Sequence, residues 1–133
     1  MKLTTKSEYS ILALLYMARK PQGQFVKIEE ICRQCEVPRK YLELLLGVLR
    51  QNRLIKTQRG TKGGYMLARP AREITVAEVV RLMDGALAPT ESVSTYFFSN
   101  TPISREEKVL AVLKEIRDYI ASRLEALTLA DLA

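Results

Sequence analysis

The sequence predicts a mainly α-helical fold that carries one small β-hairpin. Apolar residues recur at steps of three and four over most of the chain, which is the pattern of amphipathic helices. One pair of short β-prone segments flanks the glycine-rich residues 60–64, which is the pattern of a hairpin. The length of 133 residues allows a single compact core, and 47% hydrophobic with 27% charged residues is typical of a globular protein.

Two helices are expected before residue 36. The first follows a capping box at residues 5–8, Thr-Lys-Ser-Glu, and runs to about Arg19. Pro21, Gln22 and Gly23 end it, because proline and glycine disfavour a continuing helix. The second helix covers about residues 27–35, and a turn follows it.

A third helix is expected from Pro38 to about Asn52. Proline suits the first turn of a helix, because its missing N–H would have no partner there. One face of this helix is apolar and is expected to point inward, with Leu42, Leu45, Leu46 and Leu49. The other face is expected to meet solvent, with Arg39, Lys40, Glu43, Gly47 and Arg50.

The second half of the chain predicts a hairpin and two further helices. Residues 54–59 and 65–69 read as two strands. A fourth helix opens with a capping box at residues 75–78 and ends at Gly85. A loop is expected over residues 86–103. A long helix then opens with a capping box at residues 104–107.

The long helix carries an apolar stripe formed by Val109, Leu113, Ile116, Ile120, Leu124 and Leu127. The rest of a chain of this size is too small to cover the stripe, so pairing with a second copy is expected. The sequence therefore predicts a homodimer with these six residues in its interface.

Several classes of protein are excluded by composition. The chain has no histidine, the side chain most used for acid–base catalysis and the commonest metal ligand, so neither a catalytic nor a metal site is expected. The amino terminus is polar where a signal peptide would be apolar, and the apolar stretches are shorter than the ~20 residues of a bilayer span. A cytoplasmic protein without membrane association is expected.

The positive charge of the chain is concentrated in one segment. Residues 38–69 hold eight basic side chains and one acidic one, a net charge of +7, whereas the whole chain carries +6. A basic excess confined to a helix and the hairpin after it indicates a nucleic-acid partner of a winged helix-turn-helix. The alternative is a solvated basic face without a partner.

Three stretches carry a resemblance to a known family: MKLTTKSEY, PRKYLELLLGVLRQNRLIKTQRGTKGGYMLARP and EITVAEVVRLMDG. In order and spacing they resemble the Rrf2 (IscR/CymR) family of bacterial winged-helix transcription regulators. The tail LEALTLADL resembles the end of the long dimer helix of that family. The resemblance implies a winged helix-turn-helix domain over residues 1–85, an effector loop over 86–103 and a dimerisation helix over 104–133.

The resemblance also implies a transcriptional regulator that acts as a homodimer on a pseudo-palindromic operator in double-stranded DNA. Glu43 could accept a hydrogen bond from N4 of cytosine, and Arg59 could enter a minor groove. The DNA contacts expected from the recognition helix, the wing and the amino terminus are Thr4, Lys6, Arg39, Lys40, Tyr41, Glu43, Arg59, Gly60, Lys62, Gly63, Gly64 and Tyr65.

One departure from the family pattern concerns cofactors. The cluster-binding relatives carry three cysteines in the loop before the dimer helix, and residues 86–103 of this chain contain none. The sequence is therefore similar to the clusterless branch, whose members respond to other signals or to a partner protein. No iron–sulfur cluster and no other cofactor is expected, and the effector would be a small molecule or a protein.

Four features leave alternatives open. Cys32 and Cys35 form a C-x-x-C motif, for which structural cysteines are favoured over thiol redox sensing or a metal shared across a dimer. Tyr41 could pack in the core or reach a phosphate. Residues 96–98, Tyr-Phe-Phe, are expected to form local core, the alternatives being an effector pocket or a contact with the partner subunit. The whole domain could also bind proteins instead of DNA, or act as an enzyme with a cysteine nucleophile, although a histidine base is missing.

Overall fold

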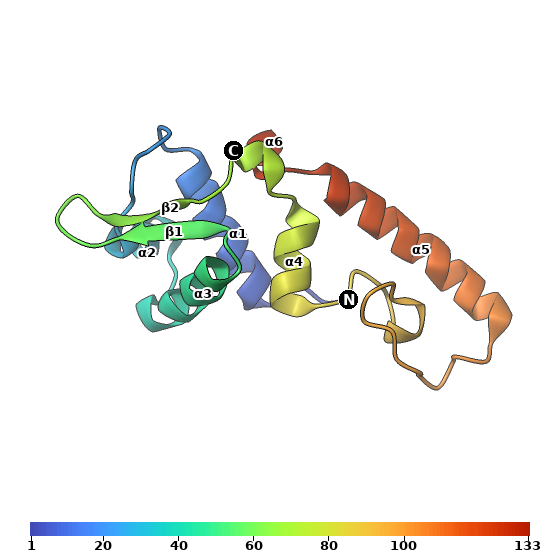
Figure 1. The fold of residues 1–133 in the computed structure, drawn as a ribbon. Helices are drawn as coiled ribbons and strands as arrows, with labels where there is room; N and C mark the ends of the chain where they lie inside the picture. Colours follow the sequence, from blue (N-terminus) through green and yellow to red (C-terminus); the bar gives the residue numbers. More distant parts are fainter.

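The computed structural model describes residues 1–133, and the expected mainly helical fold with one hairpin is confirmed (Figure 1). The chain first forms a body of helices and a hairpin. Its elements are α1 (Thr5–Ala18), α2 (Ile28–Cys35), α3 (Arg39–Gln51), β1 (Ile55–Gln58), β2 (Gly64–Leu67) and α4 (Val76–Asp84). A loop with one short 3₁₀ turn leads to α5 (Glu107–Ala126) and then α6 (Leu129–Leu132). None of the helices combines the length and apolar character that a membrane span needs.

The core of the body lies between α1, α2 and α3. The four leucines that were expected to point inward from α3 are each at most 4% exposed. They pack in one cluster with Leu14 of α1 and Ile31 of α2. Between α2 and α3 the chain turns at Glu36, whose backbone is left-handed with φ 54°, and the next residue, Val37, is buried. This turn fixes α3 against the body by its apolar face and leaves the opposite face outside.

The hairpin is fixed to the body by a third stretch of backbone. Strands β1 and β2 pair antiparallel, from Ile55 opposite Leu67 to Gln58 opposite Gly64. Val26, in the loop before α2, then pairs with Tyr65: the Val26 N–H donates to the Tyr65 carbonyl at 2.7 Å and the reverse bond measures 2.8 Å. The hairpin therefore projects from the body as a wing with a braced base.

The capping box expected at residues 5–8 is wrong by one residue. Thr4 caps α1, and its hydroxyl accepts from the Lys6 N–H at 3.2 Å. Thr4 and not Thr5 is the cap because Asp84, at the end of α4, holds Thr4 in place. The Asp84 carboxylate accepts from the Thr4 N–H at 2.9 Å and from its hydroxyl at 2.6 Å. The cap expected for α4 is confirmed, since Thr75 accepts from the Glu78 N–H at 3.1 Å.

The expectation of one helix over residues 104–133 is also wrong. The Ser104 hydroxyl accepts from the Thr101 N–H instead of capping a helix, and α5 begins only at Glu107. At the other end Thr128 and Asp131 form a capping box that starts α6. Leu129 of α6 is fully buried in the core of the body, and its N–H donates to the Ile74 carbonyl at 2.9 Å. The tail thus folds back onto the body and ends the long helix at Ala126 (Figure 1).

Candidate nucleic-acid interface

The outward face of α3 is polar along its edges and apolar at its centre. Lys40 is exposed and forms no ion pair. Leu44 is 70% exposed, although the sequence pattern did not single it out. Gly47 lies one turn further on the same face. Of the residues expected to face solvent, the four charged ones are exposed and Gly47 is half-buried, and an exposed leucine lies among them.

Arg39 and Glu43 form an ion pair along one edge of this face. The Arg39 Nε donates to Glu43 at 3.1 Å, and its Nη1 donates to Glu29 of α2 at 2.9 Å. The hydrogen bond to Glu43 and the charge of Glu29 raise the pKa of the Arg39 guanidinium. Both side chains of the i,i+4 pair remain about half exposed. Glu43, the one acid of the basic segment, is therefore paired with Arg39 at the surface.

Tyr41 links α3 to α1. Its ring meets Tyr9 edge-on with 5.6 Å between the ring centroids, and its hydroxyl lies 3.1 Å from the Thr5 hydroxyl. The side chain is half-buried and packs on the core. Of the two alternatives for Tyr41, the structure favours packing.

At the tip of the wing the charged side chains are free. Arg59 and Lys62 are exposed and form no ion pair. Lys27, from the loop before α2, donates to the Gly60 carbonyl at 2.6 Å and steadies the turn. Two cations are thus presented on a short, braced loop.

The glycines at the end of the wing have a structural reason. A Cβ on Gly63 would lie 2.0 Å from the Gln58 carbonyl oxygen. A Cβ on Gly64, whose φ is +137°, would lie 2.3 Å from the Val26 carbonyl oxygen. Tyr65 is half-buried and uses its backbone to pair with Val26. These three residues shape the wing, and their contact with DNA stays a prediction.

At the amino terminus, Thr4 and Lys6 differ in their surroundings. Lys6 is exposed and unpaired, whereas Thr4 is tied to Asp84. Burial raises the pKa of Asp84, but hydrogen bonds from Ser7 and Thr4 outweigh burial and hold that pKa below its ordinary value. The carboxylate therefore joins the end of α4 to the start of α1.

The two cysteines lie on α2, half-buried against the core. The Cys35 thiol donates to the Leu12 carbonyl at 3.8 Å. Burial raises the pKa of Cys35, which lowers the fraction of reactive thiolate. These surroundings favour structural cysteines over a redox sensor.

The six residues expected in a dimer interface divide into two groups. Val109 and Ile116 are 45% and 44% exposed, and Leu113 is half-buried. The other three, Ile120, Leu124 and Leu127, pack on a cluster made of Val76, Ala77, Val80 and Leu87 of the same chain. The stripe is therefore partly covered by its own body.

Two exposed residues of α5 were missed by the sequence analysis. Val112 is 56% exposed and Tyr119 is 68% exposed, and both lie three residues beyond an exposed member of the stripe. Their own spacing of seven residues, two helical turns, would have revealed them. The free apolar surface of α5 consists of Val109, Val112, Ile116 and Tyr119.

The aromatic residues 96–98 were expected to form local core, and this expectation is wrong. Tyr96, Phe97 and Phe98 are 71%, 44% and 63% exposed. The Arg81 guanidinium stacks on the Tyr96 ring at 5.0 Å. The hollow between this loop and α5 measures only about 30 Å³, less than a small-molecule site needs.

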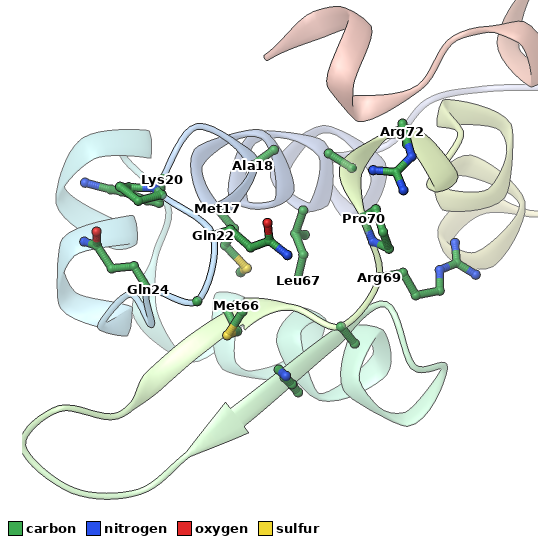
Figure 2. A pocket seen from close by; sticks show the side chains of 15 residues that line it. Met17, Ala18, Lys20, Gln22, Gln24, Met66, Leu67, Arg69, Pro70 and Arg72 are labelled. Atoms are coloured by element: carbon green, nitrogen blue, oxygen red, sulfur yellow. The ribbon is translucent and has the colours of Figure 1, made fainter.

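A larger cleft of about 560 Å³ lies at the base of the wing, between the end of α1 and β2 (Figure 2). Met17, Met66 and Leu67 give it an apolar floor. Its lining has no acidic residue and four basic ones, Lys20, Lys56, Arg69 and Arg72. Two of these four cations already have acidic partners, because Lys20 pairs with Glu30 and Arg69 with Glu78. This cleft was not predicted from the sequence.

Comparison with known proteins agrees with this geometry. The model of the Rrf2 family, described as iron-dependent transcriptional regulators, matches residues 3–133. The chain belongs to the Rrf2 family. It is 35% identical to an HTH-type transcriptional regulator of Mycobacterium tuberculosis, over 100% of this chain and 81% of that protein. It is 30% identical to CymR of Bacillus subtilis, over 100% of this chain and 90% of that protein.

Solved structures of Rrf2 regulators have the same fold. CymR of B. subtilis, described as a global cysteine regulator, superposes with a TM-score of 0.80 at 28% identity, covering 100% of this chain and 96% of that one. IscR of T. potens gives 0.77 at 29% identity, covering 99% and 85%. The protein is thus a winged-helix transcriptional regulator and not an enzyme.

The residues of this chain do not fit the iron that the family description implies. The two cysteines both lie on α2, and the sequence has no histidine. Nowhere in the structure do three Cys, His, Asp or Glu side chains gather as a ligand set. An iron–sulfur cluster held by cysteines would lack donors here.

Proposed function

We propose that this Rrf2 regulator binds double-stranded DNA with α3 in the major groove and the wing on the adjoining backbone or minor groove. The observation that carries the proposal is the free charge of this surface. Six basic side chains of α3 and the wing region are exposed and unpaired, namely Lys40, Arg50, Arg53, Lys56, Arg59 and Lys62. Such a surface attracts anions, and DNA phosphates supply them.

The roles within this surface follow from the surroundings of each side chain. Glu43 accepts from a cytosine N4 while Arg39 holds its carboxylate in place. Lys40, Arg59 and Lys62 contact phosphates or base edges, and Lys6 lies at the backbone beside α1. Thr4, Tyr41, Gly60, Gly63, Gly64 and Tyr65 hold the elements that carry these side chains.

The protein acts as a homodimer through α5. This helix has no buried residue, and its N-terminal half projects from the body (Figure 1). The exposed Val109, Val112, Ile116 and Tyr119 bury their apolar surface against a second copy. Two copies of α3 then meet two half-sites of a pseudo-palindromic operator about one DNA turn, ~34 Å, apart.

The regulatory signal does not pass through an iron–sulfur cluster, because two cysteines on α2 and no histidine do not make a full ligand set. A small molecule or a partner protein supplies the signal instead. Protein purified without oxygen should therefore be colourless and free of iron and acid-labile sulfide.

The proposed DNA contacts are tested by exchanging one base-reading and one phosphate-binding side chain. An operator is first selected from random duplexes with the wild-type protein. Glu43→Ala should relax base preference at one position per half-site with a modest loss of affinity, whereas Lys62→Ala should weaken binding to all sequences alike. If both variants changed only the overall affinity, Glu43 would have no role in reading bases.

A further inference from the structure

Leu44 lies at the centre of the outward face of α3, where no other part of the chain covers it. The buried leucines of α3 at positions 42, 45, 46 and 49 are at most 4% exposed, whereas Leu44 is 70% exposed. At 100° per residue, the direction opposite the buried face runs through Lys40, Leu44 and Gly47. Glu43 and its partner Arg39 lie to one side. The residue that points furthest outward in the middle of α3 is therefore apolar.

Gly47 provides a second, independent observation on the same face. Glycine inside a helix lowers its stability relative to alanine. A Cβ on Gly47 would meet no atom within 4 Å, so the packing of this chain does not require glycine there. Without a side chain, the backbone of α3 can approach an outside surface more closely. The bare backbone and the exposed leucine are one helical turn apart and face the same way.

The charged residues around Leu44 indicate which kind of partner binds this face of α3. Lys40 and Arg50 are exposed on α3 without acidic partners, so this helix favours an anionic partner. The major groove offers phosphates at its rims and, on its floor, one apolar group, the C5-methyl of thymine. An apolar side chain at the centre of a helix flanked by cations matches that arrangement.

We infer that Leu44, beside the bare backbone of Gly47, contacts the C5-methyl group of a thymine and so selects a T·A pair at one position in each half-site. This inference rests on the proposed DNA binding through α3. Burial of one methyl group is worth about a fourfold change in affinity. The preference is separate from the one assigned to Glu43, because the two side chains lie at different angles around the helix.

The test replaces single thymines of the selected operator by uracil, which removes the methyl group and keeps the base pair. Wild-type protein should bind about fourfold more weakly when one particular thymine of a half-site is replaced. Leu44→Ala should bind the thymine operator more weakly by a similar factor and should be indifferent to uracil at that position. Leu44→Met, which keeps an apolar side chain, should still prefer thymine. Because Leu44 is exposed, the melting temperature of both variants should match that of the wild type.

Three results would overturn the inference. If no uracil substitution weakens wild-type binding, or if Leu44→Ala keeps the full preference for thymine, Leu44 does not contact a methyl group, although DNA binding itself stands. If the wild-type protein binds no duplex, the proposed function fails as well. Gly47→Ala is the final arm: a higher melting temperature together with weaker operator binding supports the close approach, and unchanged binding contradicts it.

Discussion

Helices α3 and α5 are both amphipathic in sequence, yet α3 covers its leucine face fully within the chain, whereas α5 covers only the C-terminal half of its apolar stripe. Four leucines of α3 are buried, whereas none of the 20 residues of α5 is. Helix α3 packs against α1, α2 and β1, while α5 packs on α4 and on the short turn near residue 92. A periodic apolar stripe therefore predicts an amphipathic helix, but it does not show whether the same chain or another molecule covers the stripe.

The largest effect is expected from a charge in the free surface of α5. Ile116→Asp places an unpaired carboxylate in the proposed dimer interface, and the two-fold symmetry of a dimer would place it there twice. At about 2 kcal/mol per copy, the dimer should dissociate about a thousandfold more readily. Light scattering over a concentration series measures the shift. Lys114→Asp, at an exposed polar position of the same helix, should leave the dimer intact.

A monomeric wild type, or an Ile116→Asp variant that stays dimeric, would show that α5 is not covered by a second copy. In that case its exposed residues would have to meet another protein.

A substitution in the apolar face of α3 should lower the stability of the fold and leave the assembly of the dimer unaffected. Leu46 is fully buried, so Leu46→Ala should lower the free energy of unfolding by about 3 kcal/mol. Leu44→Ala, the same change at a 70% exposed position two residues earlier, should alter it by less than about 0.5 kcal/mol. Urea denaturation in the monomeric Ile116→Asp background measures both without a contribution from dissociation. Equal losses at the two positions would contradict the assignment of the faces of α3.

A smaller effect is expected at Asp84, which joins α4 to α1. Its pKa is held below the ordinary value of 3.8, so the ionised carboxylate stabilises the fold above that pH, and this contribution is lost as the pH falls through the folded-state pKa. Asp84→Asn should cost about 1–2 kcal/mol at pH 7, and the difference from wild type should vanish in acid. Denaturation at several pH values tests this. Glu91→Gln, at an exposed position, is the control, and a loss for Asp84→Asn that did not change with pH would contradict the role of the charge.

The sequence predicted most of the fold because its local signals agree with its tertiary contacts. Thr75 and Glu78 mark the start of α4, and the structure uses the cap that they form. At the amino terminus Thr4 and Thr5 are adjacent and equally good caps. The choice between them depends on Asp84, which lies 80 residues further along the chain and could not be inferred from local pattern.

The end of α5 was misjudged because two signals overlap. The apolar stripe continues through Leu124 and Leu127, while Thr128 and Asp131 already form the cap of the next helix. Burial of Leu129 in the body decides in favour of the break.

Part of the candidate DNA surface was visible in the sequence. The i,i+4 spacing of Arg39 and Glu43 permits an ion pair on a helix. The second partner of Arg39, Glu29, comes from another helix, so only the fold shows that the Arg39 guanidinium lies between two carboxylates. Leu44 was missed because four neighbouring leucines share its type, and its exposure depends on how α3 is turned against the body.

The most direct test of the central claim, that α3 and the wing bind DNA through their free cations, is the salt dependence of operator binding. Each phosphate contact contributes about −0.9 to the slope of log K against log salt concentration. Lys62→Ala, which removes one contact from each subunit of a dimer, should therefore flatten the slope by about 1.8. Lys108→Ala, which removes an exposed cation from α5, should leave the slope unchanged. A steep wild-type slope that Lys62→Ala flattens is the predicted result, and binding that does not depend on salt, or a slope that the two variants change equally, would contradict the account.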